Sequence, residues 1–151
     1  MRPLRAEGRI PLRAVPTAVR AAILDPAVLA RIIPGAERVA GDGEGGYTAV
    51  LGLGVGPFRG RQAVALRAED GAGGLAVSGR ADGPFGSGTA TGRIDLLPEA
   101  GGTLLCWRYD GAVRGPVSLA GPLLLRLSAT AFTAGVFRAL KRLLEERSRP
   151  G

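Results

Sequence analysis

The sequence predicts a single α+β domain over residues 1–151, in which a curved antiparallel sheet wraps around one long C-terminal helix. Three patterns predict this class. Between residues 36 and 114, strand-like runs alternate with glycine-rich turns, which is typical of an antiparallel meander. Two short segments bounded by prolines precede this region. After it, apolar residues recur every three or four positions, which is the period of a helix.

The N-terminal part is predicted to hold one strand and two short helices. Pro16 is suited to the beginning of a helix, and Asp25 should end it because the residue before a proline resists helical backbone. The next helix should end at the pair Pro34-Gly35. The predicted elements are a strand at 8–15 and helices at 17–24 and 27–33.

The central part is predicted to be all strand and turn. Its turns contain Gly41 to Gly46, Gly71 to Gly74, Gly83-Pro84 and Gly101-Gly102. The strands between and around them are expected at 36–40, 47–55, 60–69, 75–82, 87–97 and 103–114.

A long helix is predicted over 117–147, with a kink or restart at Gly121-Pro122. The stretch 115–137 is also long and apolar enough to be considered as a membrane span. Arg126 at its centre and the amphipathic continuation beyond it favour a helix that lies on a sheet. The face expected to be buried comprises Leu125, Ala129, Phe132, Val136, Leu140 and Leu143.

Composition excludes several classes of function. The chain has no histidine, so it lacks Ser-His-Asp and Cys-His machinery and imidazole metal ligands. One cysteine, Cys106, cannot form an intrachain disulfide, and the charged N-terminus does not match a signal peptide, so we expect a cytoplasmic protein. The net charge is +7, but the basic residues are scattered and nearly all arginine, so we expect no nucleic-acid partner.

Small residues on three neighbouring strands suggest space inside the sheet. If side chains alternate, the strands at 75–82, 87–97 and 103–114 turn glycine and alanine inward where a core normally has larger residues. The small residues could simply permit curvature or a close helix, but we favour an apolar ligand cavity in which Gly92 borders free volume. Ser128 and the Tyr109 hydroxyl are the polar groups expected to orient a carbonyl. The candidate ligand-binding residues are Val77, Gly79, Ala90, Gly92, Trp107, Tyr109, Leu125, Ser128 and Phe132.

No catalytic constellation is evident in the sequence. Asp110 is expected to form an ion pair with the nearby Arg108, and Cys106 faces outward without a partner base. The glycines of 52–56 lie inside a strand pattern with no helix to hold a phosphate, so they do not indicate a dinucleotide site. We expect a binding protein with no metal site.

Several motifs occur in an order that resembles the CoxG family of carbon monoxide dehydrogenase subunits. They are Asp25-Pro26, Leu29, Ile33-Pro34-Gly35, Val55-Gly56-Pro57, Gly60, Gly88-Thr89-Ala90-Thr91-Gly92, Gly102-Thr103, Gly115 and Leu119-Ala120-Gly121. The resemblance covers about residues 7–144, and it implies a helix-grip fold of the polyketide-cyclase and START-like superfamily.

The resemblance also implies a function. It points to a non-catalytic accessory protein of a molybdenum hydroxylase such as carbon monoxide dehydrogenase, with a role in membrane recruitment or electron transfer. The implied ligand is hydrophobic and quinone-like, with no covalent cofactor. Two alternatives stay open: a cyclase- or hydrolase-type enzyme on the same fold, and a lipid or small-molecule carrier or interaction module.

A peripheral contact with the inner face of the membrane is a further expectation. On the helical wheel, Leu123 and Leu127 fall toward the charged side, and Arg126 lies between them. Exposed leucines with a basic collar suit docking to an anionic bilayer or to a partner. The alternative is that these leucines pack on the short helices at 17–24 and 27–33.

Overall fold

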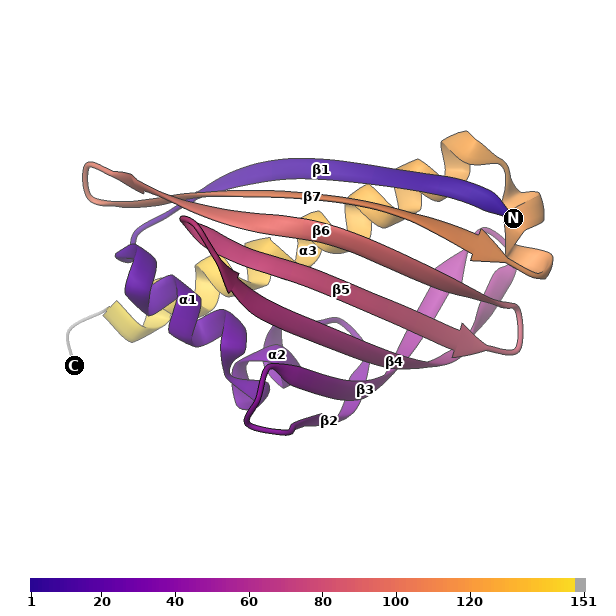
Figure 1. Ribbon diagram of the computed structural model, residues 1–151, viewed down its shortest axis with the longest axis horizontal. Coiled ribbons are helices and arrows are strands. Elements are labelled where there is room, and N and C mark those ends of the chain that lie inside the picture. The colour runs from indigo at the N-terminus through magenta and orange to yellow at the C-terminus, as the bar shows by residue number, and fades with distance from the viewer. Residues whose placement is uncertain (149–151) are drawn as a thin grey trace.

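The computed structural model describes residues 1–148, which form one sheet and three α-helices (Figure 1). The order of elements agrees with the α+β prediction. The strands are β1 (Arg2–Leu12), β2 (Ala36–Gly41), β3 (Gly46–Val55), β4 (Phe58–Gly71), β5 (Gly74–Gly83), β6 (Gly86–Glu99) and β7 (Gly102–Arg114). The helices are α1 (Pro16–Leu24), α2 (Pro26–Ile32) and α3 (Pro122–Ser148), with a 3₁₀ turn, η1 (Pro116–Ala120), before α3.

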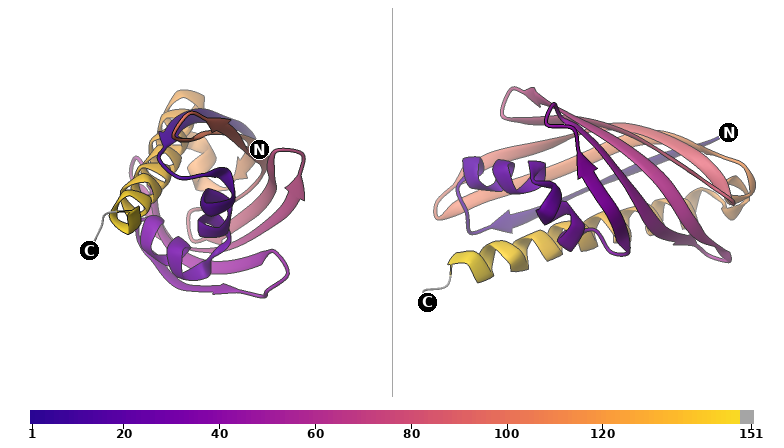
Figure 2. Two further views of the ribbon diagram at one scale, coloured as in Figure 1. Left: turned by 90° about the vertical axis from the view of Figure 1, so that its left-hand side faces the viewer. Right: turned by 90° about the horizontal axis from the view of Figure 1, so that it is seen from below.

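The seven strands form one antiparallel sheet in the order β1-β7-β6-β5-β4-β3-β2. All the connections from β2 to β7 are hairpins, as the glycine-rich turns predict, and β1 pairs with β7. Figure 2 shows the sheet curling around an axis, with α3 filling its open side and α1 and α2 covering one end. The sheet therefore grips α3 along its length.

Two predicted boundaries were wrong. The first strand begins at Arg2, well before residue 8, because β7 supplies it with partners from Arg2↔Val113 to Leu12↔Thr103. The C-terminal helix begins at Pro122 instead of residue 117. Gly121 has a φ of 89°, a left-handed conformation that glycine adopts easily and that separates η1 from α3.

The two short helices are joined at Asp25-Pro26, as expected. The Asp25 carboxylate accepts a hydrogen bond of 2.9 Å from the backbone N–H of Ala27, so it caps α2, while Pro26 occupies the first position of that helix. This cap fixes the turn between α1 and α2, which together close one end of the sheet.

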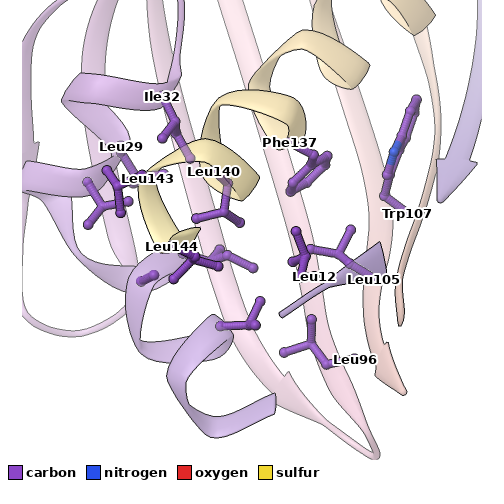
Figure 3. Packing of buried hydrophobic residues seen from close by; sticks show 14 of the residues in the cluster. Leu12, Leu29, Ile32, Leu96, Leu105, Trp107, Phe137, Leu140, Leu143 and Leu144 are labelled. Atoms are coloured by element: carbon purple, nitrogen blue, oxygen red, sulfur yellow. The ribbon is translucent and has the colours of Figure 1, made fainter. Parts of the chain in front are cut away.

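The densely packed core lies at the end that α1 and α2 cover (Figure 3). Leu105 on β7 and Leu140 on α3 are fully buried there. The predicted helical face is confirmed at Leu125, Leu140 and Leu143, which are buried. Phe137 and Leu144 are buried as well, although the three- and four-residue pattern did not include them. The core also includes Leu12, Val19, Val28, Ile32, Leu75, Leu96 and Trp107.

Candidate functional site

The inward faces of β5, β6 and β7 have the alternation that the sequence predicted. The register aligns Val77 with Gly92 and Gly92 with Tyr109, so these three predicted site residues form one row across the sheet. Gly79 and Ala90 belong to the next row. The structure therefore brings the five candidates on these strands other than Trp107 into two adjacent rows.

Burial of the inward side chains changes along the grip. Near α1 and α2 the inward leucines of β5, β6 and β7 are buried. Farther from those helices, the side chains that face α3 are only partly buried, although they are apolar and their register directs them inward. We call this set the apolar lining; it comprises Val64, Leu66, Ala81, Val113 and Phe132. The lining lies outside the packed core and remains partly accessible to solvent.

Trp107 marks the boundary between the packed core and the apolar lining. Its ring stacks on Tyr109 at 5.9 Å and on Phe137 at 6.2 Å, and only 5% of the residue is exposed. Gly8 of β1 lies beneath the ring, where a Cβ atom would approach the indole to 2.5 Å. Gly8 is thus required for this packing, and nothing in the local sequence marked it as a site residue.

Tyr109 is tied to the helix, which differs from the predicted arrangement. Its hydroxyl lies 2.8 Å from Thr133 Oγ1 and 3.2 Å from the carbonyl oxygen of Ala129. Thr133, not Ser128, is therefore the polar partner of Tyr109, because it lies on the side of α3 that faces β7. Burial raises the pKa of the Tyr109 hydroxyl, while its hydrogen bond with Thr133 partly opposes the shift.

The glycine floor is not free volume, which corrects the prediction for Gly92. A Cβ at Gly92 would overlap the Arg108 carbonyl and approach Tyr109 Cβ to 2.6 Å. At Gly79 a Cβ would lie 2.6 Å from Leu66 Cδ2. These glycines allow neighbouring side chains to lie against the backbone, so ligand space is defined by the apolar lining instead.

A hollow of about 650 Å³ includes Gly79 and Ala90 among its lining residues, but no residue of α3 lines it. The remaining candidates are not part of it. Leu125 is buried, while Ser128 and Phe132 are partly buried on α3. The hollow is therefore distinct from the predicted space between sheet and helix.

The remaining chemical candidates do not assemble a catalytic group. Asp110 pairs with Arg5 of β1 at 2.6 Å, not with Arg108 as predicted, because β1 extends far enough to lie opposite it. Cys106 is partly exposed. Within residues 1–148, no group of three His, Cys, Asp or Glu side chains could hold a metal ion.

Exposed apolar side chains gather at the end of the molecule away from α1 and α2. Leu123 and Leu127 are 70% and 58% exposed, so the alternative that they pack on the short helices was wrong. Contacts between the segments bring this end together: Val117 N–H donates to the Phe85 carbonyl, Arg2 donates to the Ser118 carbonyl, and Leu124 lies near Gly56. We call the set the apolar rim; it comprises Met1, Phe85, Leu119, Leu123, Leu124 and Leu127.

Helix α3 is long and apolar enough to cross a membrane by length and composition alone. Its inward leucines and Phe137, however, belong to the same core as the sheet and the short helices. In this structure α3 is the gripped helix of a folded domain, as the sequence predicted.

A curved antiparallel sheet closed by a long helix, with an apolar lining between them, defines the helix-grip class of START-like proteins. Two solved structures place the chain in this class. A conserved protein from Geobacillus kaustophilus superposes with a TM-score of 0.85 at 24% identity, covering 93% of this chain and 94% of the other. The Zhui aromatase/cyclase from Streptomyces sp. R1128 superposes with a TM-score of 0.74 at 18% identity, covering 97% and 96%.

The family model for CoxG, a component of carbon monoxide dehydrogenase, matches residues 8–145. The chain belongs to the CoxG family, which confirms the resemblance drawn from its motifs. No curated protein is similar enough to count as a relative.

Proposed function

We propose that the protein binds a hydrophobic, quinone-like molecule between sheet and helix, without transforming it, and serves a molybdenum hydroxylase such as carbon monoxide dehydrogenase. The observation that carries the proposal is the partial exposure of the apolar lining beside a fully packed core. Family membership supports the choice of partner enzyme. The ligand would be held without covalent attachment, from the cytoplasmic side of the membrane.

The chemistry of the interior supports binding over catalysis. Tyr109 is the titratable side chain on the inward faces of β5, β6 and β7, and its raised pKa keeps it protonated at neutral pH. A cyclase- or hydrolase-type enzyme would need a general base near the reacting atoms. The aromatase/cyclase among the structural neighbours shares the fold with this chain, and that similarity is the observation that favours an enzyme.

Decylubiquinone tests the proposal, with Trp107 as the reporter. We expect saturable quenching of the single tryptophan, because the indole borders the apolar lining. Ala81→Phe should fill space beside the lining and weaken binding by about tenfold or more. Ala63→Phe is the matched control, since Ala63 is exposed on the outward face of β4.

The outcome that contradicts the proposal is equally direct. Unchanged fluorescence at saturating quinone, together with no retained ligand in native mass spectrometry, would show that side chains fill the interior. Recovery of a chemically altered quinone would favour the enzyme instead.

The second part of the proposal is that the apolar rim contacts an anionic bilayer, from which such a ligand would enter. The rim is formed by exposed side chains from four segments of the chain. No Asp or Glu occurs from residue 111 to residue 144, whereas Arg114 and Arg126 flank the rim in sequence. Apolar side chains with nearby cations bind anionic lipid surfaces.

A further inference from the structure

The 650 Å³ hollow crosses the sheet from β2 to β6. Two rows of outward residues flank it: Thr48, Ala65, Arg80 and Thr89 form one row, and Gly46, Arg67, Ser78 and Thr91 form the other. Between them runs the row Tyr47, Leu66, Gly79 and Ala90, whose side chains point toward α3. Because both flanking rows point outward, the hollow is a groove on the face of the sheet opposite α3, which we call the outer groove.

Each wall of the outer groove carries one arginine. Arg80 on β5 forms no ion pair within residues 1–148, and Arg67 on β4 makes only a long contact of 3.4 Å with Glu69. The two guanidinium groups can therefore accept an anionic partner between them.

Hydroxyl groups supply further donors along the walls. The side chains of Thr48, Ser78, Thr89 and Thr91 make no hydrogen bond to another described residue. They are therefore free to donate to carboxylate or carbonyl oxygens of an occupant.

Asp42 is the carboxylate that lines the groove, and it is engaged by its own turn. It accepts hydrogen bonds from the backbone N–H groups of Glu44 at 2.6 Å and Gly46 at 3.0 Å. These two bonds lower the pKa of Asp42. Asp42 does not form an ion pair with Arg67 or Arg80, so the two arginines are left for a partner.

The dimensions of the groove indicate an extended chain. Four strand-to-strand steps of about 4.8 Å span roughly 19 Å, which an extended peptide of about six residues covers. The groove is open to solvent along its length, whereas small molecules are usually held in clefts that bury most of their surface. We propose that the outer groove binds an extended acidic segment, about six residues long, of a partner protein.

This surface is separate from the proposed ligand site, because it lies on the opposite face of the sheet from α3. An occupant there would leave the apolar lining and the apolar rim uncovered. The inference stands independently of the quinone proposal.

The test uses fluorescein-labelled hexaglutamate as the probe, with binding measured by fluorescence anisotropy. We expect Arg67→Ala with Arg80→Ala to weaken binding about tenfold or more, because both walls lose their cation. The matched control is Arg9→Ala with Arg138→Ala, which removes the same charge from exposed arginines on β1 and α3. The control should change the affinity by about twofold or less.

A second variant tests the groove itself without changing charge. Ala65→Trp would place an indole between the walls, and we expect it to block hexaglutamate about as strongly while the melting temperature stays close to wild type. Amide shifts on hexaglutamate binding, measured by NMR, should concentrate at Thr48, Ser78 and Thr89.

Three outcomes would overturn the inference. Equal losses in the two double-arginine variants would show that net charge alone attracts the peptide. Shifts that avoid β3 to β6 would place the site elsewhere. Preferential binding of a single-stranded oligonucleotide at the same residues would identify a nucleic-acid surface instead of an acidic segment.

Discussion

Tyr109 joins the sheet to the helix through its hydroxyl group. The hydroxyl lies within hydrogen-bond distance of Thr133 Oγ1, and Thr133 donates in turn to the Ala129 carbonyl at 2.9 Å. This network holds α3 at the boundary between the packed core and the apolar lining. A ligand that entered the lining would contact the Tyr109 ring, while the hydroxyl stays bonded to the helix.

We expect Tyr109→Phe to lower the free energy of unfolding by about 1 kcal/mol at pH 7, which is the usual contribution of a neutral hydrogen bond. Burial raises the folded-state pKa of Tyr109, so the folded protein holds this proton more tightly than the unfolded chain does. The contribution is therefore complete below the unfolded pKa of about 10 and is lost as pH rises through the folded pKa. Urea unfolding of both proteins at neutral and strongly alkaline pH measures this difference.

Thr133→Ala completes a double-mutant cycle with Tyr109→Phe. A coupling free energy near zero at neutral pH would contradict the tie between sheet and helix, as would a stability difference that does not shrink at alkaline pH.

At the scale of the elements, β6 and β7 approach closely at Gly92. We expect Gly92→Val to destabilise the protein by about 1–3 kcal/mol, because its added atoms would overlap the Arg108 carbonyl and press on Tyr109. Thr89→Val places a similar side chain on the exposed face of the same strand and should change stability by less than about 0.5 kcal/mol. Thermal unfolding of both variants gives the comparison. Tolerance of Gly92→Val with loss of quinone binding would instead restore the view that Gly92 borders free volume.

The order of the elements could be predicted because their boundaries depend on local chemistry. Asp25-Pro26 and Gly121-Pro122 stop or restart helices wherever they occur, and alternation along the strands assigns the inward faces without knowledge of the partner strand. The early start of β1 could not be predicted in this way, because residues 2–7 become a strand only by pairing with β7.

Most of the site could not be predicted for the same reason. The Thr133 partner of Tyr109 depends on how α3 is rotated against the sheet, and the ring of Trp107 needs Gly8, about a hundred positions away. The outer groove and the apolar rim both combine residues from segments that come together only in the folded chain. Composition and periodicity record the inward or outward direction of these residues, but not their neighbours.

At the scale of the whole molecule, the two ends of the grip differ in kind. One end is capped by α1 and α2 and holds the packed core, whereas the other carries the apolar rim. A ligand carrier needs one such opening, and a rim of leucines is compatible with contact to the interior of a bilayer.

Sedimentation with phosphatidylglycerol vesicles tests the rim directly. We expect the wild type to sediment with these vesicles, more weakly at high salt, and to bind phosphatidylcholine vesicles poorly, because the arginines near the rim are attracted to anionic headgroups. Leu123→Glu with Leu127→Glu should reduce binding about tenfold or more while the melting temperature changes little, since both leucines are mostly exposed. The matched control is Val15→Glu with Leu97→Glu, which adds the same charges at two exposed apolar residues outside the rim and should retain most of the binding. Equal losses in both double variants would attribute vesicle binding to net charge alone, and unfolding of the Leu123 and Leu127 variant or absence of wild-type binding would refute docking through the rim.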